Sequence, residues 1–311
     1  MPANEEEKQS QVIMRESVGF WQDGFRRLRK NKVAMVSLFV IIVVMIFSFI
    51  VPAFYPYDYK TQIKGSENLH PMQYSEKEIE RMDAGEKVFP HVLGTDKMGR
   101  DIYARVIYGA RASLTSTFGV VVLIFLVGSV VGVIAGYFGG KIDAVLMRIA
   151  DMMLAFPGLV LALAVAGIMG ASIRNAIIAI VAVNWTKYAR LARSLVMKIR
   201  DRDYVSAAIV TGSQTPYMLL RYMLPNALPT LIITAATDVG GMMLEIAALS
   251  FLGFGAKPPT PEWGYMLNEG RACMQSAPWM MLYPGLAIFL VVVVFNMLGD
   301  SIRDILDPRA E

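Results

Sequence analysis

Long apolar stretches separated by short polar ones dominate the chain. Uncharged runs cover residues 33–54, 112–140, 152–173 and 272–299, and their lengths are 22, 29, 22 and 28 residues. A helix that crosses a bilayer needs about 20 mostly apolar residues. Each run is therefore predicted to form a transmembrane helix, and the first is too long for a cleaved signal peptide.

Two further spans are less regular. Residues 175–186 form an uncharged run of only 12, about 18 Å of helix, so the basic residues that follow must extend it toward the head groups. Residues 222–256 are long enough but contain Asp238 and Glu245. With these two segments, the pattern predicts an all-α integral membrane protein with six transmembrane helices.

The distribution of Lys and Arg predicts the orientation. Residues 1–32 and 187–226 hold seven basic residues each, whereas residues 55–111 hold nine basic and nine acidic residues. Basic residues concentrate in cytoplasmic loops, which places both termini in the cytoplasm. The predicted organisation is a cytoplasmic tail with an interfacial helix (1–32), a first transmembrane helix (33–54), an extracytoplasmic loop (55–111), a five-helix core (112–302) that includes the segment 203–225, and a cytoplasmic tail (303–311).

Apolar residues also recur at helical spacing before the first span. Val18, Trp21, Phe25 and Leu28 stand beside basic residues. Such a pattern predicts an amphipathic helix lying on the inner membrane face. The alternative is the cytoplasmic start of the first span.

Composition narrows the functional classes. Of the 311 residues, 55% are hydrophobic and 18% are charged, against about 25% charged in globular proteins. The charges are too few to cover a soluble surface, which argues against a soluble enzyme. The net charge of +4 does not gather on a soluble face, so no nucleic acid partner is expected.

Candidate metal and nucleotide chemistry is sparse. The single cysteine, Cys273, excludes an internal disulfide, and His70 and His91 are too few for a closed metal site. Both histidines are expected to be solvated loop residues. The only Gly-Lys pair, Gly140-Lys141, lacks the surrounding phosphate-binding loop, so no cofactor and no catalytic residue is predicted in this chain.

Four glycines mark a helix-packing face in the second span. Gly128, Gly132, Gly136 and Gly140 are spaced four residues apart. This spacing lines one face of a helix and lets a second helix approach closely in lipid.

Ionisable residues inside predicted spans are candidates for a translocation pathway. Asp238 and Glu245 are seven residues apart and share one helix face, and intramembrane carboxylates mark pathways by default. For Glu245, a packing role with polar partners is the alternative. Asp143, Arg148 and Asp151, at the inner start of the third span, are instead expected to form a structural network.

A short cytoplasmic helix is predicted between the fourth and fifth spans. Asp203 is a favourable N-cap and Gly212 a favourable residue after the C-cap. The face made of Tyr204, Ala207, Ala208 and Thr211 is small and mildly apolar. It suits a partner groove, or packing on the ends of the chain's own helices. Thr215-Pro216 then restarts a helix, which Leu224-Pro225 is expected to stop.

This segment resembles the EAA loop of permease subunits in bacterial ATP-binding-cassette (ABC) importers. Ala207-Ala208, Gly212 and Leu224-Pro225 stand at the family's spacing, whereas Ser206 replaces a Glu and Tyr222 an Ile. Other motifs resemble the second permease of dipeptide, oligopeptide and nickel importers: Leu93-Gly94-Thr95-Asp96, Gly99-Arg100-Asp101, residues 151–157, Leu249 to Gly253, Trp263-Gly264, Leu298-Gly299-Asp300 and Asp307-Pro308-Arg309.

The resemblance implies a type I ABC importer permease in the bacterial inner membrane. It implies that residues 203–212 couple the chain to an ATPase subunit, and that two such subunits bind ATP and Mg. It also implies a second homologous permease, an extracytoplasmic substrate-binding protein, a lipid surround and transport of di- or oligopeptides by alternating access. The alternatives are a nickel or nickel-chelate permease, an ion-coupled secondary transporter using Asp238 and Glu245, and a membrane-embedded hydrolase, for which no nucleophile–base pair is visible.

Overall fold

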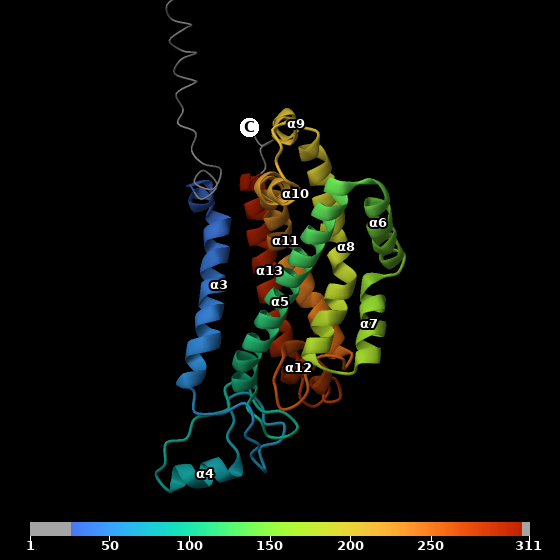
Figure 1. Cartoon of the computed structure of the whole chain (residues 1–311). Helices are drawn as coiled ribbons and strands as arrows, with labels where there is room; N and C mark the ends of the chain where they lie inside the picture. The colour runs from blue at the N-terminus through green and yellow to red at the C-terminus, as the bar shows by residue number, and fades with distance from the viewer. Residues whose placement is uncertain (1–25, 307–311) are drawn as a thin grey trace, which may run out of the picture.

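The computed structural model describes residues 26–306, and within that range the chain is a helical bundle without a β-strand (Figure 1). Four helical segments are long and apolar enough to cross a membrane, and a bent helix pair could supply a fifth span. The elements are α3 (Lys32–Ile50), a 3-10 turn (Val51–Ala53), α4 (Glu76–Asp83), α5 (Ile102–Phe138), α6 (Gly140–Leu154), α7 (Gly158–Met169), α8 (Ile173–Arg200), α9 (Asp203–Val210), α10 (Thr215–Met218), a π-helical turn (Leu219–Met223), α11 (Leu224–Phe251), α12 (Trp263–Arg271) and α13 (Trp279–Leu306).

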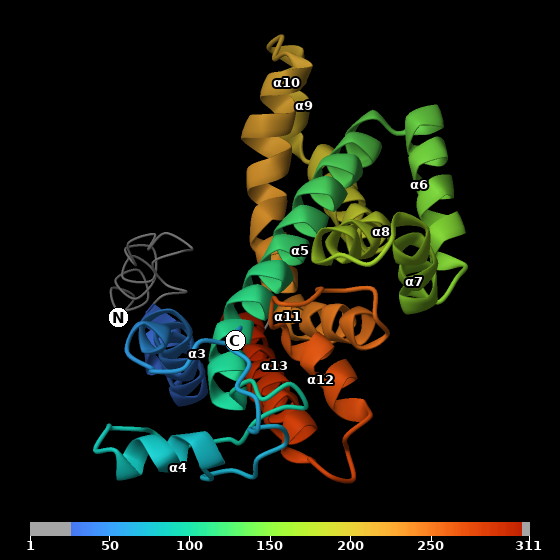
Figure 2. The same ribbon diagram turned by 90° about the horizontal axis from the view of Figure 1, so that it is seen from below.

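The bundle has two distinct ends. α9 and α10 lie at one end, which we call the α9 end (Figure 1). At the other end, the α4 end, lie α12 and the long loop of residues 54–101, which contains α4. Viewed from below, α3 and the α6–α7 pair lie on opposite sides, with α5 and α13 between them (Figure 2). The most extensive helix contact joins α5 to α8.

Glycines make that contact close. A Cβ atom added at Gly128 would collide with Tyr188, and one at Gly132 would collide with Ala189. At Gly136 it would lie 2.9 Å from the Arg193 carbonyl oxygen. The expected role of Gly140 is wrong: α5 ends at Phe138, and Gly140 begins α6 with φ +53°. No atom lies within 4 Å of a Cβ added at Gly140.

The third predicted span is broken. Residues 152–173 were expected to form one helix, but α6 and α7 meet at 92°. Pro157 explains the break, because proline disfavours helical backbone at the preceding residue and cannot donate a backbone hydrogen bond. The fourth predicted span is one continuous helix, α8, which runs from Ile173 through the basic residues to Arg200. Helix α8 is not among the segments of residues 26–306 that are apolar enough to count as spans.

Three helix boundaries also differ from expectation. α5 begins ten residues before the predicted span, because the Asp101 carboxylate caps it by accepting from the Ala104 N–H at 2.7 Å. Helix α13 begins at Trp279 rather than near residue 272. The expected stop at Leu224-Pro225 does not occur, since a π-helical turn joins α10 to α11. We attribute this to the missing N–H of Pro225, which a wider turn accommodates.

The predicted interfacial helix lies mostly outside the described residues, as does the end of the C-terminal tail. Residues 26–30 are helical. Asn31 then caps α3, its side-chain oxygen accepting from the N–H groups of Val33 and Ala34 at 3.0 and 3.1 Å. A capped new helix therefore begins where the first span was predicted.

Candidate functional site

Helix α9 lies at the tip of the α9 end, as Figure 1 shows. Its N-cap is Arg202, and Asp203 is the first helical residue rather than the cap. The helix ends at Val210, and Gly212 has φ +83°. This left-handed backbone is the reason for a glycine after the helix C-terminus.

The exposed face of α9 differs from the predicted one by one residue. Tyr204, Ala207 and Thr211 are exposed, but Ala208 is 7% exposed and packs inward with Val205. The inward side is set by the pair at i and i+3, which joins the hydrophobic core. Further apolar side chains extend the exposed face, and we call this set the α9–α10 surface: Tyr204, Ala207, Ile209, Val210, Thr211, Tyr217 and Leu220.

Aromatic packing holds this surface in place. The Tyr222 ring lies 6.1 Å from that of Tyr204 and 5.9 Å from that of Tyr217. Tyr222 replaces the isoleucine of the EAA pattern. Its ring makes a tilted contact with Tyr204, which links the π-helical turn to α9.

Polar side chains of α8 and α11 meet where the two helices face each other. Lys187 Nζ lies 2.6 and 2.8 Å from the two Asp238 carboxylate oxygens, and the Tyr188 hydroxyl donates to Asp238 at 3.0 Å. The Asn184 amide donates to Glu245 at 2.8 Å. Both predicted pathway carboxylates thus face α8, and their partners were not predicted. Asn184 and Tyr188 are four residues apart, whereas Asp238 and Glu245 are seven apart, so spacing gave no signal for these pairs.

The network expected near the start of the third span takes a different form. Asp143 of α6 accepts two hydrogen bonds from Arg193 of α8, and Asp151 pairs with Arg190. Arg148 belongs to neither pair. α6 is therefore attached to α8 rather than held by charges within its own segment.

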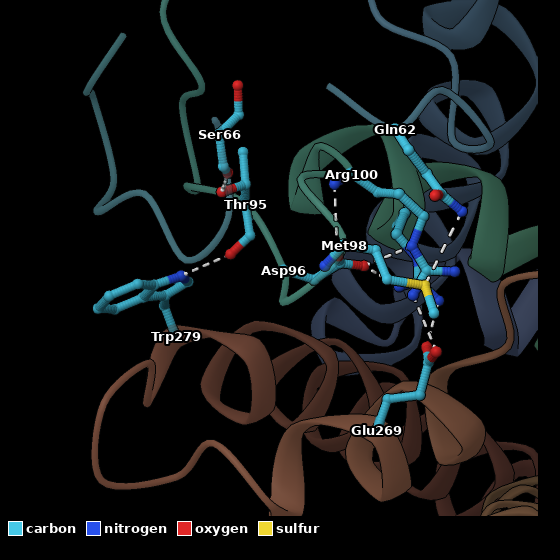
Figure 3. Close-up of polar contacts among 9 residues, drawn as sticks. Gln62, Ser66, Thr95, Asp96, Met98, Arg100, Glu269 and Trp279 are labelled. Carbon is cyan, nitrogen blue, oxygen red and sulfur yellow. Dashed lines mark hydrogen bonds and ion pairs between the residues drawn. The ribbon is translucent and has the colours of Figure 1, made fainter. Parts of the chain in front are cut away.

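A buried four-charge cluster fastens the long loop to α12 at the α4 end (Figure 3). Arg100 Nε lies 2.6 Å from Asp96, and Arg100 Nη2 lies 2.8 Å from Glu269. Arg105 contacts the same two carboxylates. Burial lowers the pKa of Arg100, but Asp96 and Glu269 outweigh it and raise that pKa. The cluster is neutral, which makes its burial tolerable.

The expectation that both histidines are solvated fails for His91. Its ring is fully buried, with Nδ1 2.8 Å from Asp101 and Nε2 3.2 Å from Glu78. The ring stacks on Tyr57 at 4.5 Å. His70 is exposed. The carboxylate partners that bury His91 come from α4 and from the start of α5, so the loop has its own folded core.

Glu262, which the sequence did not indicate as special, caps α12. Its carboxylate accepts from the N–H groups of Gly264 and Tyr265, both at 2.9 Å, and from the Ser113 hydroxyl at 3.2 Å. Burial raises the pKa of Glu262 despite these donors. The cap ties α12 to α5. Among the described residues, no group of three or more His, Cys, Asp or Glu residues could hold a metal ion.

This arrangement, a bundle of long apolar helices with one short helix exposed at an end, defines the class as a polytopic helical membrane protein. Residues 128–311 match the family described as binding-protein-dependent transport system inner membrane component, and residues 19–71 match the N-terminal TM domain of oligopeptide transport permease C. The chain belongs to this family of ABC importer permeases, which confirms the predicted relationship.

Relatives align along most of the chain. The dipeptide transport system permease protein of Alkalihalophilus pseudofirmus is 41% identical over 94% of this chain and 91% of its own length. That of Haemophilus influenzae is 39% identical over 90% of this chain and 92% of its own. The nickel transport system permease protein of Escherichia coli K12 is 41% identical over 70% of this chain and 79% of its own.

Solved structures confirm the fold. A chain of the MetNI methionine ABC transporter superposes with a TM-score of 0.54 at 17% identity, covering 66% of this chain and 97% of its own. A chain of an amino acid ABC transporter with histidines superposes with a TM-score of 0.50 at 17% sequence identity. The match covers 64% of this chain and 92% of that chain. At this identity the likeness concerns the fold alone, which is that of a type I ABC importer permease.

Proposed function

We propose that this permease forms, together with a second homologous permease, the pathway by which an ATP-driven importer carries di- or oligopeptides. The two dipeptide relatives support this proposal because they align over at least 90% of the chain. The nickel relative is as similar over a shorter stretch, and nickel or a nickel chelate is the alternative cargo. Uptake of labelled dipeptide and of nickel by cells carrying the complete importer distinguishes the two.

The α9 end faces the cytoplasm and the α4 end faces outward in this proposal, and the basic residues near α9 support it. Cysteines at Lys77 and Gln214, both exposed positions, test it in a Cys273→Ser background. An impermeant thiol reagent added to intact cells should label position 77 and spare position 214. The reverse pattern would overturn the orientation.

The α9–α10 surface docks on an ATPase subunit in this proposal. The observation that carries it is the set of exposed apolar side chains on α9 beside the small Ala207, which a groove can approach closely. ATP and Mg belong to two such ATPase subunits. Their closure would move α9 and turn the bundle outward, where a substrate-binding protein delivers cargo.

A matched pair of substitutions tests docking. Ala207→Glu would bury an unpaired charge at the interface, which costs on the order of 1–3 kcal/mol or more, so the ATPases should be lost on co-purification while the second permease is retained. Ser206→Glu introduces the same side chain at the neighbouring exposed position, where the family carries Glu, and should retain both. Ala208→Glu is less informative because Ala208 is buried. Full ATPase recovery and transport with Ala207→Glu would refute docking.

Asp238 and Glu245 line the pathway in this proposal. The Lys187 side chain opposite Asp238 is 59% exposed in the isolated chain, which supports an accessible polar face between α8 and α11. The rival from another class, ion-coupled transport, predicts uptake that continues with hydrolysis-deficient ATPase subunits. The importer predicts that such subunits abolish uptake.

A further inference from the structure

A cavity of about 370 Å³ lies between the first helix and the rest of the bundle. Its walls come mainly from α3, α5 and α13, and include Val43, Phe47, Ile107, Ala110, Ala287 and Val291. The polar groups at its wall are already satisfied: the Ser48 hydroxyl donates to the Val44 carbonyl at 2.7 Å, and the Trp263 indole N–H donates to the Val106 carbonyl at 2.8 Å. We call this cavity the α3 groove.

The position and size of the α3 groove restrict its occupant. Its α3, α5 and α13 walls belong to helices that are long and apolar enough to cross a membrane, and an apolar wall does not hold water. Along α3 the groove runs from Val43 to Ser48, about 7.5 Å of helix rise. The occupant is therefore apolar, and a hydrocarbon chain of the bilayer meets this requirement.

A cation stands beside the groove. Arg111 follows Ile107 by four residues on α5, so the two share a helix face. Its Nε donates to the Ser48 carbonyl at 2.8 Å and its Nη2 to the Phe49 carbonyl at 3.0 Å. No carboxylate within residues 26–306 forms an ion pair with Arg111. Two of five guanidinium donors are used in these bonds, which leaves others for an anion.

Aromatic rings mark the depth of this cation. The Arg111 guanidinium lies 5.0 Å from the Phe49 ring centre and 5.3 Å from that of Tyr108. The Tyr108 ring packs at 4.6 Å on Tyr59. Tyrosines gather where a bilayer meets water. The groove therefore extends from the level of the lipid head groups into the hydrocarbon layer.

We propose that a glycerophospholipid binds here, with one acyl chain in the α3 groove and its phosphate on Arg111. Charge complementarity at Arg111 selects this occupant over an apolar helix of the second permease. The site goes beyond transport itself and depends only on the membrane location of the chain. It would fill the space that separates α3 from the core.

Native mass spectrometry of the purified importer, supplied with 16:0/18:1 phosphatidylglycerol, tests the site. Ala287→Phe fills the groove and should lower retained lipid at least fivefold, whereas Ala144→Phe makes the same change at an exposed position on α6 and should leave it unchanged. Arg111→Ala should lower retention to a similar extent. Arg111→Lys keeps the charge and should retain more lipid than Arg111→Ala.

A photoreactive amino acid at Phe47 provides a second readout that does not depend on filling the groove. Cross-linking should add the mass of a phospholipid to this chain. Cross-links to the second permease instead would show that a partner helix occupies the groove, and would overturn the proposal. Equal lipid retention by wild type and Ala287→Phe, with both complexes intact, would overturn it as well.

Discussion

Lys187 of α8 and Asp238 of α11 form an ion pair, with Nζ 2.6 and 2.8 Å from the two carboxylate oxygens. The pair joins two helices that also bring Asn184 and Glu245 together. A charge near the centre of a membrane is costly unless it meets a partner or water, and each charge of this pair is the other's partner. Glu245 instead accepts a hydrogen bond from the neutral Asn184 amide at 2.8 Å.

Replacing Asp238 by Asn is expected to lower peptide uptake at least tenfold while the importer still assembles and retains basal ATP hydrolysis. The reason is that the pathway loses a carboxylate that a cationic group of the cargo can approach. The double variant Lys187→Met/Asp238→Asn removes both charges. Uptake restored by the double variant would show that Asp238 only neutralises Lys187, and failed assembly of Asp238→Asn would make the residue structural.

Two glycines of α5 provide a matched test of helix packing. Gly132→Ala should destabilise the purified permease pair by about 1–3 kcal/mol, because the new methyl group would press against Ala189 and Ala192 of α8. At Gly119 no atom lies within 4 Å of an added Cβ, so Gly119→Ala should be neutral or stabilise by about 0.4–1 kcal/mol. Melting midpoints by size-exclusion chromatography measure both, and equal effects would contradict the close α5–α8 contact.

The buried charge cluster predicts a large effect from a single neutralisation. Glu269→Gln leaves Arg100 and Arg105 with one carboxylate, Asp96, and should cost about 3–5 kcal/mol of stability. Glu86→Gln makes the same change in the Arg81–Glu86 pair, whose side chains are 61% and 53% exposed, and should cost far less because water and salt screen an exposed pair. Limited proteolysis of the long loop would report the difference. Similar stability of the two variants would contradict a structural role for the cluster.

Local rules predicted most of the helices, because uncharged runs of sufficient length have few other structures in a bilayer. The glycine after α9 was also predictable, since its backbone conformation suits few other residues. The bend at Pro157 was missed because hydropathy continues across it. The prediction used the length and hydropathy of the segment, and neither takes account of the backbone geometry of a single proline. That geometry breaks the helix at Pro157.

Long-range partners account for the other differences. Glu269 lies 169 residues from Arg100, and no local pattern indicates that the two meet. Several charged residues between 55 and 111 are buried, among them Asp96, Arg100 and Arg105, and nothing in the sequence around them indicated this. Ala208 likewise belonged to the expected exposed face of α9, yet burial of Val205 fixed the rotation of that short helix and turned Ala208 inward.

Glu262 lies before α12, outside the four long apolar segments, and predicts a specific pH dependence. Burial raises its pKa above the ordinary 4.5, so the folded protein holds this proton more tightly than the unfolded chain. The stabilising contribution of the protonated form is present at low pH and declines as pH rises above 4.5 toward the raised value. Glu262→Gln removes this titration.

The melting midpoint of Glu262→Gln relative to wild type should therefore increase as pH rises from 4.5 to 8. At pH 4.5 the variant should be the less stable, because an amide offers one acceptor oxygen where the carboxyl group receives the Gly264 and Tyr265 N–H groups on two. The exposed Glu86→Gln variant provides the control, and its melting midpoint should change with pH in the same way as that of wild type. If the difference in melting midpoint between Glu262→Gln and wild type stays constant with pH, the pKa of Glu262 is not raised in the folded protein and the prediction is wrong.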